Sequence, residues 1–147
     1  MFWWNVLGRR QIVRAARCGS NRWLSASRSE VGNVRKLNED ACLDLAGSGL
    51  WVVADGMGGH HAGYYASRTI VETLAGVQPR LRPSEFIDDV EDRLVRVNHD
   101  LHTRSTSGDT PTLTGSTVVA LAAFDRFGVC LWAGDSRLYR LRGIESG

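Results

Sequence analysis

The stretch WVVADGMGGHHAG, from Trp51 to Gly63, constrains the fold of this 147-residue chain more than any other segment. Its apolar run has the length of a strand, and the β-branched Val52 and Val53 are typical of a strand buried on both faces. The glycines that follow predict a loop, and apolar residues recurring at three- and four-residue steps from position 62 predict a helix. A strand, a glycine loop and a helix are therefore expected in succession, with Asp55 where the strand ends.

This order of elements also suits a dinucleotide-binding turn, but the spacing argues against one. In a G-x-G-x-x-G pattern read from Gly56, the third glycine would fall at position 61, which is His61. Asp55 would repel a phosphate at this turn unless a cation lay between them. Together with Glu39 and Asp40, Asp55 instead offers hard oxygen ligands that suit Mg²⁺ or Mn²⁺.

The adjacent acids Glu39 and Asp40 pose a geometric problem, because neighbouring strand residues point to opposite faces. Either the strand ends at this pair, or one carboxylate acts on the metal through a bound water. The alternative for all three acids, including Asp55, is that they are solvated turn residues.

The remaining segments predict helices first and strands afterwards. An amphipathic helix is expected over residues 62–74, and a second over residues 84–101, with Ser84 as its N-cap. Three strand candidates follow, at residues 116–124, 128–133 and 137–142. Two consecutive helices and then an antiparallel meander favour an α+β fold over βαβ alternation.

The N-terminal part of the chain is basic, which is not typical of the folded domain expected after it. Residues 1–22 carry arginines but no acid, so they are expected to be a leader, disordered or dispensable, with organellar targeting as the alternative. Residues 23–47 then predict a β-hairpin region. The folded domain is accordingly expected over residues 23–147.

Composition excludes several functional classes. The chain is 43% apolar, which suits one globular domain, and its formal net charge of +2 is too small to indicate a nucleic-acid binder. No apolar run approaches the roughly 18 to 20 residues that cross a bilayer. Cys18, Cys42 and Cys130 are odd in number and widely spaced, which favours a reducing cytoplasm over a disulfide framework.

Four motifs between Val31 and Arg142 resemble a known family in order and spacing. RKLNED, VVADGMGGH, TGSTVVAL and AGDSRLYRLR are similar to the N-terminal half of the metal-dependent type 2C (PPM) Ser/Thr protein phosphatases of the bacterial type. The resemblance implies an α+β fold, an antiparallel β-sandwich flanked by helices, that is incomplete at its C-terminus. It also implies hydrolysis of phosphoserine and phosphothreonine by water activated by two Mn²⁺ or Mg²⁺ ions, acting on phosphoproteins in opposition to a Ser/Thr kinase.

The resemblance assigns metal-binding roles by position. Asp55 corresponds to the carboxylate that bridges both metals, and the Gly56 carbonyl to a ligand of one of them. Glu39 and Asp40 correspond to the family's acidic pair, which works mostly through coordinated water. Asp135 corresponds to an aspartate near an additional, weaker metal site, and a simple hairpin turn is the other interpretation of its motif.

Two further residues receive roles in substrate chemistry. Arg35 corresponds to the arginine that grips the substrate phosphate, which suits its planar fork of donors. An exposed strand arginine is the alternative there. His60 is a candidate general acid for the leaving alkoxide, because histidine titrates near neutrality.

The resemblance places the family's remaining metal aspartates in a half that would follow Arg142. The sequence therefore predicts a truncated phosphatase domain with a weakened metal site. A non-catalytic remnant that binds phosphoproteins through Arg35, or interacts through exposed strands, is the alternative from the binding class. A metal hydrolase of small phosphate esters is a third hypothesis.

Overall fold

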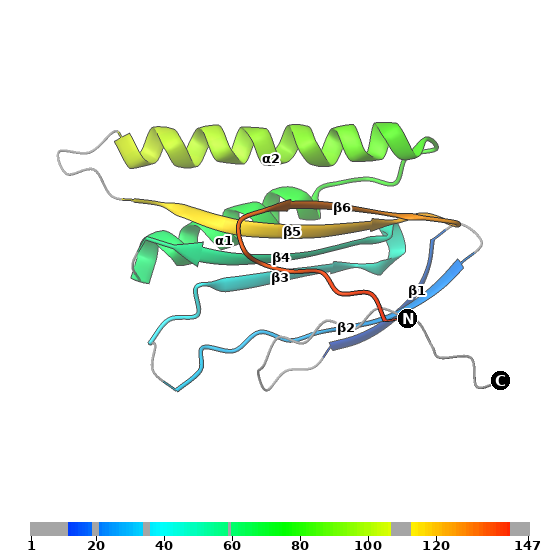
Figure 1. Ribbon diagram of the computed structural model, residues 1–147, viewed down its shortest axis with the longest axis horizontal. Coiled ribbons are helices and arrows are strands. Elements are labelled where there is room, and N and C mark those ends of the chain that lie inside the picture. The colour runs from blue at the N-terminus through cyan, green and yellow to red at the C-terminus, as the bar shows by residue number, and fades with distance from the viewer. Residues whose placement is uncertain (1–11, 19–20, 34–35, 59, 107–112, 142–147) are drawn as a thin grey trace.

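The computed structural model describes residues 12–18, 21–33, 36–58, 60–106 and 113–141 (Figure 1). The elements in these ranges are strands β1 (Ile12–Cys18), β2 (Asn21–Ser27) and β3 (Asp40–Leu45), the short 3₁₀ helix η1 (Ala46–Ser48), strand β4 (Leu50–Met57), helices α1 (His60–Ala75) and α2 (Pro83–Thr106), and strands β5 (Gly115–Ala123) and β6 (Gly128–Ala133).

The centre of the fold is a four-stranded antiparallel sheet in the order β3-β4-β5-β6. Strand β4 is the apolar run predicted from the sequence, and it pairs with β3 on one side and with β5 on the other. Helices α1 and α2 follow each other in the chain and lie on the same face of this sheet (Figure 1). The expected α+β architecture is confirmed.

The main core lies between this sheet and the two helices. Leu50 of β4, Leu74 of α1 and Val90 of α2 are completely buried there. Burying each such aliphatic side chain contributes about 1.5–3 kcal/mol to the stability of the fold. The apolar stripe predicted on the second helix is also confirmed, with its members buried or packed against the core: Phe86, Ile87, Val90, Leu94, Val97 and Leu101.

Both helices begin earlier than the sequence pattern suggested. Helix α1 starts at His60, and α2 starts at Pro83, so the predicted N-cap at Ser84 is wrong. The Phe86 N–H donates to the Arg82 carbonyl at 3.2 Å, which makes Pro83 the first helical residue. Proline suits that position because an N–H there would have no acceptor within the helix, so its absence costs nothing. The φ of proline is also already helical.

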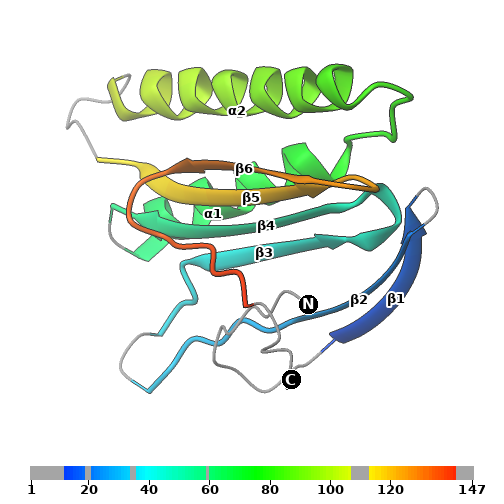
Figure 2. The same ribbon diagram turned by 45° about the vertical axis from the view of Figure 1, so that its right-hand side comes forward.

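A two-stranded sheet, β1-β2, covers part of the other face of the main sheet. Figure 2 shows it curving across the side away from α2. Trp23 of β2 packs edge-on against Trp51 of β4, with ring centroids 5.6 Å apart. The Ser25 hydroxyl lies 2.9 Å from both carboxylate oxygens of Asp44 on β3, to which it donates. These contacts give the sandwich part of its second layer.

The N-terminal pairing differs from the predicted hairpin over residues 23–47. Strand β2 pairs with β1, from Ile12 opposite Ser27 to Cys18 opposite Asn21, whereas β3 pairs with β4. The reason is the length of the connections, because the short link between β1 and β2 and the turn at Gly49 favour local antiparallel pairs. Gly49 has a φ of 68°, a conformation that glycine adopts at little cost. Residues 12–18 of the expected leader are therefore a strand, while residues 1–11 lie outside the described part.

The third predicted strand of the meander, residues 137–142, is also not observed. Residues 137–141 form no strand in the structure, and residue 142 lies outside the described part. A strand needs a hydrogen-bonding partner, and no described strand pairs with this segment. Leu138 instead packs against the small cluster around Trp51.

One charged group joins the two helices. Arg93 of α2 donates from Nε to Asp89 at 2.8 Å and from Nη1 to the Thr73 carbonyl of α1 at 2.9 Å. The hydrogen bond from Arg93 holds the pKa of Asp89 below its ordinary value. The pair therefore satisfies a carbonyl at the end of α1 and fixes α2 beside it.

Replacing Asp89 with asparagine tests this link. The folded state lowers the pKa of Asp89, so its contribution is present above the ordinary aspartate pKa and is lost as the pH falls through the lower, folded value. We expect Asp89→Asn to lower the free energy of unfolding by about 0.3–1 kcal/mol at neutral pH, and the difference from wild type to vanish in acid. Urea denaturation at several pH values measures this, with exposed Asp88→Asn as the control that should show no such pH dependence.

Candidate active site

Three polar residues line up across neighbouring strands at one end of the main sheet. Asp40 of β3 is directly opposite Asp55 of β4, and Asp55 is directly opposite Thr117 of β5. Directly paired residues of antiparallel strands project from the same face, so these side chains form one row. Asp55 is exposed and Asp40 is partly buried. The register thus brings together two of the predicted metal ligands.

Glu39 takes a different position from Asp40, because β3 begins between them. The Asp40 N–H donates to the Asn38 side chain at 3.0 Å, and the Glu39 carbonyl accepts from the Gly56 N–H at 3.0 Å. The Glu39 side chain is buried, with 7% of its surface exposed, and its Oε1 lies against Gly63 in the first turn of α1. Strand β3 therefore ends at this pair, with Asp40 inside the strand and Glu39 before it.

These acids border a cleft of about 360 Å³. Its walls come from the β2–β3 connection and the ends of β3 and β4, and four of its lining residues are acidic: Glu30, Glu39, Asp40 and Asp55. Such a cleft repels a phosphate and attracts a cation. Within the described ranges, however, no three acidic, histidine or cysteine side chains gather into a group that could hold a metal ion. The carboxylates present therefore supply only part of a metal-ligand set.

Strand β4 continues two residues beyond Asp55, further than the glycines predicted, and its end is held by close backbone contacts. A Cβ on Gly56 would lie 2.0 Å from the Gly63 carbonyl oxygen, far inside van der Waals contact. Gly58 has a φ of 124°, and a Cβ there would meet the Leu113 carbonyl oxygen. The glycines are thus required where the chain passes between the strand end and the helix.

The sequence analysis missed Thr117 and Ser136, whose hydroxyls lie 2.6 Å apart. Thr117 is buried, and Gly134, with a φ of 100°, packs directly on its side chain. This contact holds the turn that carries Asp135 against β5. The contact is made at Thr117, which is the residue paired with Asp55. Asp135 itself is exposed. The TGST and GDSR motifs contain both residues, so the sequence marked them as part of the family's pattern. That their hydroxyls meet depends on the tertiary structure and could not be predicted from the motifs.

Two predicted site residues cannot be placed from the structure. Arg35 lies outside the described residues. His60 is the first residue of α1, but its side chain lies outside the description. The neighbouring His61 is exposed.

Nucleophilic chemistry is disfavoured at Cys130. Burial raises the pKa of the Cys130 thiol, which makes the nucleophilic thiolate less available at neutral pH. Cys130 and Cys42 are both free thiols.

The sequence matches the family model of protein phosphatase 2C over residues 31–144. The chain belongs to the protein phosphatase 2C family. It is 37% identical over 123 residues to the serine/threonine protein phosphatase PstP of Mycobacterium tuberculosis, an alignment that covers 82% of this chain and 23% of that protein.

Solved structures show the same fold. PppA, described as a key regulatory component of the T6SS in Pseudomonas aeruginosa, matches with a TM-score of 0.74 and 40% identity over 94% of this chain and 54% of that one. The catalytic domain of PstP, solved in complex with 2 manganese ions, matches with a TM-score of 0.63 and 24% identity over 87% of this chain and 49% of that one. The chain thus spans about half of the solved domains and less of the curated relative.

None of the helices in the described part of the chain has both the length and the apolar character needed to cross a membrane.

The Gly56–Gly63 contact predicts a sharp difference between two glycine substitutions. Gly56→Ala places a methyl group against rigid backbone, so we expect the free energy of unfolding to fall by about 1–3 kcal/mol or more. Gly47→Ala is the matched control, because a Cβ there meets nothing within 4 Å. Chemical denaturation of both variants measures the difference. Equal stability of the two would show that α1 does not approach β4 as described.

Proposed function

We propose that this chain forms the metal-binding half of a protein serine/threonine phosphatase domain, which hydrolyses phosphoserine and phosphothreonine in proteins and opposes a Ser/Thr kinase. The observation that carries the proposal is the direct pairing of Asp40 and Asp55 at the border of an acidic cleft. Membership of the protein phosphatase 2C family supports it.

The donor set fits Mn²⁺ or Mg²⁺ in part. Asp40 and Asp55 offer carboxylate oxygens from one face of the sheet, and the Gly56 carbonyl is the proposed third donor. The PstP catalytic domain was solved with two manganese ions, which supports the same metal chemistry here. When bound, two such ions lower the pKa of a shared water and offset charge on the phosphoryl oxygens.

The chain's own residues have separate tasks in this proposal. The carboxylates of the cleft keep phosphate out until cations neutralise them, so substrate binding depends on metal. Arg35 grips the substrate phosphate, and His60 donates a proton to the leaving alkoxide. Asp135, on the turn fixed by the Thr117–Ser136 contact, belongs to a weaker additional metal site. Buried Glu39 acts mostly through coordinated water and contacts α1.

We also propose a cytoplasmic location for the protein. Cys42 and Cys130 are free thiols in the described structure. Thiols persist in this form where the compartment is reducing.

Manganese binding and phosphate release test the proposed function together. We expect Asp55→Asn to weaken Mn²⁺ binding by more than about tenfold, because it removes a ligand rather than an outer-shell partner, and to abolish release of phosphate from a phosphothreonine peptide. Calorimetry and a phosphate assay measure the two effects. Asp100→Asn, an exposed position on α2, is the control that should change neither.

A small ester such as p-nitrophenyl phosphate, assayed in parallel, separates protein phosphatase activity from general ester hydrolysis. A preference for the small ester over the phosphopeptide would contradict the proposed substrate class. Mn²⁺ affinity that is unchanged in Asp55→Asn would contradict the proposed metal site.

A further inference from the structure

Two arginines on the helices stack on tyrosine rings. The Arg68 guanidinium lies over the ring of Tyr64, 5.4 Å from the ring centroid, and both residues belong to α1. The Arg104 guanidinium of α2 lies over the ring of Tyr65 on α1, 4.6 Å from its centroid. All four side chains are exposed. Because the two tyrosines are consecutive, the stacks form one surface that crosses from α1 to α2, the tyrosine–arginine patch.

Neither arginine of the patch pairs with an acid of its own helix. Glu72 lies four residues after Arg68, and Asp100 lies four residues before Arg104. At the same spacing Arg93 does form an ion pair, of 2.8 Å. Among the residues that the structure describes, however, Arg68 and Arg104 have no ion pair and donate no hydrogen bond. A guanidinium stacked on a ring keeps its in-plane N–H donors available, so the patch presents two sets of donors to an outside acceptor.

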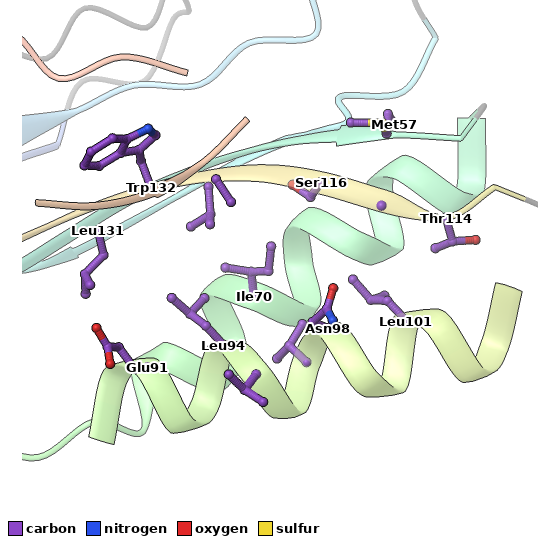
Figure 3. A pocket seen from close by; sticks show the side chains of 15 residues that line it. Met57, Ile70, Glu91, Leu94, Asn98, Leu101, Thr114, Ser116, Leu131 and Trp132 are labelled. Carbon is purple, nitrogen blue, oxygen red and sulfur yellow. The ribbon is translucent and has the colours of Figure 1, made fainter. Parts of the chain in front are cut away.

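Helix packing alone does not account for the patch. One stack joins α2 to α1, but the other, Arg68 on Tyr64, lies within α1 and joins no two elements. The apolar faces of both helices are directed elsewhere. Ile70 of α1 and Leu101 of α2 are buried and project into a groove between α2 and the β5–β6 side of the sheet (Figure 3). The exposed patch is therefore separate from the surfaces that hold the helices on the sheet.

The patch lies at the end of the molecule that carries the candidate active site. Figure 1 and Figure 2 both show the start of α1, the end of α2 and the end of β4 at this end. Gly63, the residue before Tyr64, is held against Glu39 and Gly56 of the site. From Gly63 to Arg68 the helix rises by about 7.5 Å. A peptide with its phosphate at the cleft therefore reaches the patch with roughly four to six extended residues.

We propose that the tyrosine–arginine patch binds acidic residues that flank the phosphoserine or phosphothreonine of a protein substrate. Each guanidinium offers a planar fork of donors that matches a carboxylate, and the ring beneath holds it in place. The acidic cleft repels carboxylates, so the acids of a bound substrate lie outside it, on the patch. That the occupant is a phosphatase substrate rests on the proposed function, whereas the preference for acidic residues does not.

Peptide binding to the full chain tests the patch. One peptide carries a phosphonate mimic of phosphothreonine, which water cannot cleave, and glutamates roughly four to six positions away on both sides. A second peptide has glutamines in place of the glutamates. Fluorescence anisotropy with Mn²⁺ present measures both dissociation constants. We expect the glutamate peptide to bind about fivefold to tenfold more tightly, because two guanidinium groups then find acceptors, and the preference to shrink as salt is added.

Substitutions assign that preference to the patch. Arg68→Gln should reduce the preference for glutamate about threefold, because it removes one guanidinium. Arg96→Gln is the matched control, since Arg96 is an exposed arginine of α2 that lies outside the patch, and it should leave the preference unchanged. Tyr64→Leu should weaken the preference, whereas Tyr64→Phe, which keeps a ring beneath the guanidinium, should retain it. Circular dichroism checks that each variant is folded.

Equal binding of the two peptides by well-folded chain, or no binding of either, would overturn the patch. A preference for glutamate that survives in Arg68→Gln would also overturn it, as would equal effects of Arg68→Gln and Arg96→Gln. A third peptide, with the glutamates and an unmodified threonine, separates this inference from the proposed function. If it binds as tightly as the phosphonate peptide and Arg68→Gln weakens it, the patch is supported and the proposed function is contradicted.

Discussion

Burial of strand β4 on both faces is the constraint on which the rest of the structure depends. Leu50 and Val52 face the two helices, and Trp51 faces the β1-β2 ribbon, so the strand can neither slip by one residue nor turn over. Its neighbours β3 and β5 are then fixed by backbone pairing. The position of Asp55, two residues before the end of β4, follows from apolar packing earlier in the strand.

The acidic cleft shows how this packing produces chemistry. Two carboxylates held side by side repel each other, and a fold tolerates them where solvent or a cation offsets the charge. Asp55 is exposed, whereas Glu39 is buried against the first turn of α1, whose positive end favours a nearby carboxylate. Glu39 and Asp55 both line the cleft, but only Glu39 also lies against the first turn of α1.

The sheet is well enclosed at β4 and open at β6. Burial falls across it, from the interior positions of β5 to the exposed ones of β6, because α2 does not close over the last strand. An isolated edge of this kind invites pairing with another chain. The candidate metal ligands Asp40 and Asp55 and the open edge at β6 lie at different sides of the sheet.

The sequence by itself determined the local elements and the family. The apolar run at β4, the helical periodicity of α1 and α2 and the four motifs were visible because each depends on residues close together in the chain. The partner of β2, the absence of a strand over residues 137–141 and the N-terminal position of Pro83 were not, since alternative pairings and caps differ little in local preference. Only the tertiary structure decided that Asp40 faces Asp55, that Glu39 turns toward Gly63 and that Thr117 meets Ser136. Each of these contacts joins residues distant in sequence, and strand register and helix packing, rather than residue type, bring them together.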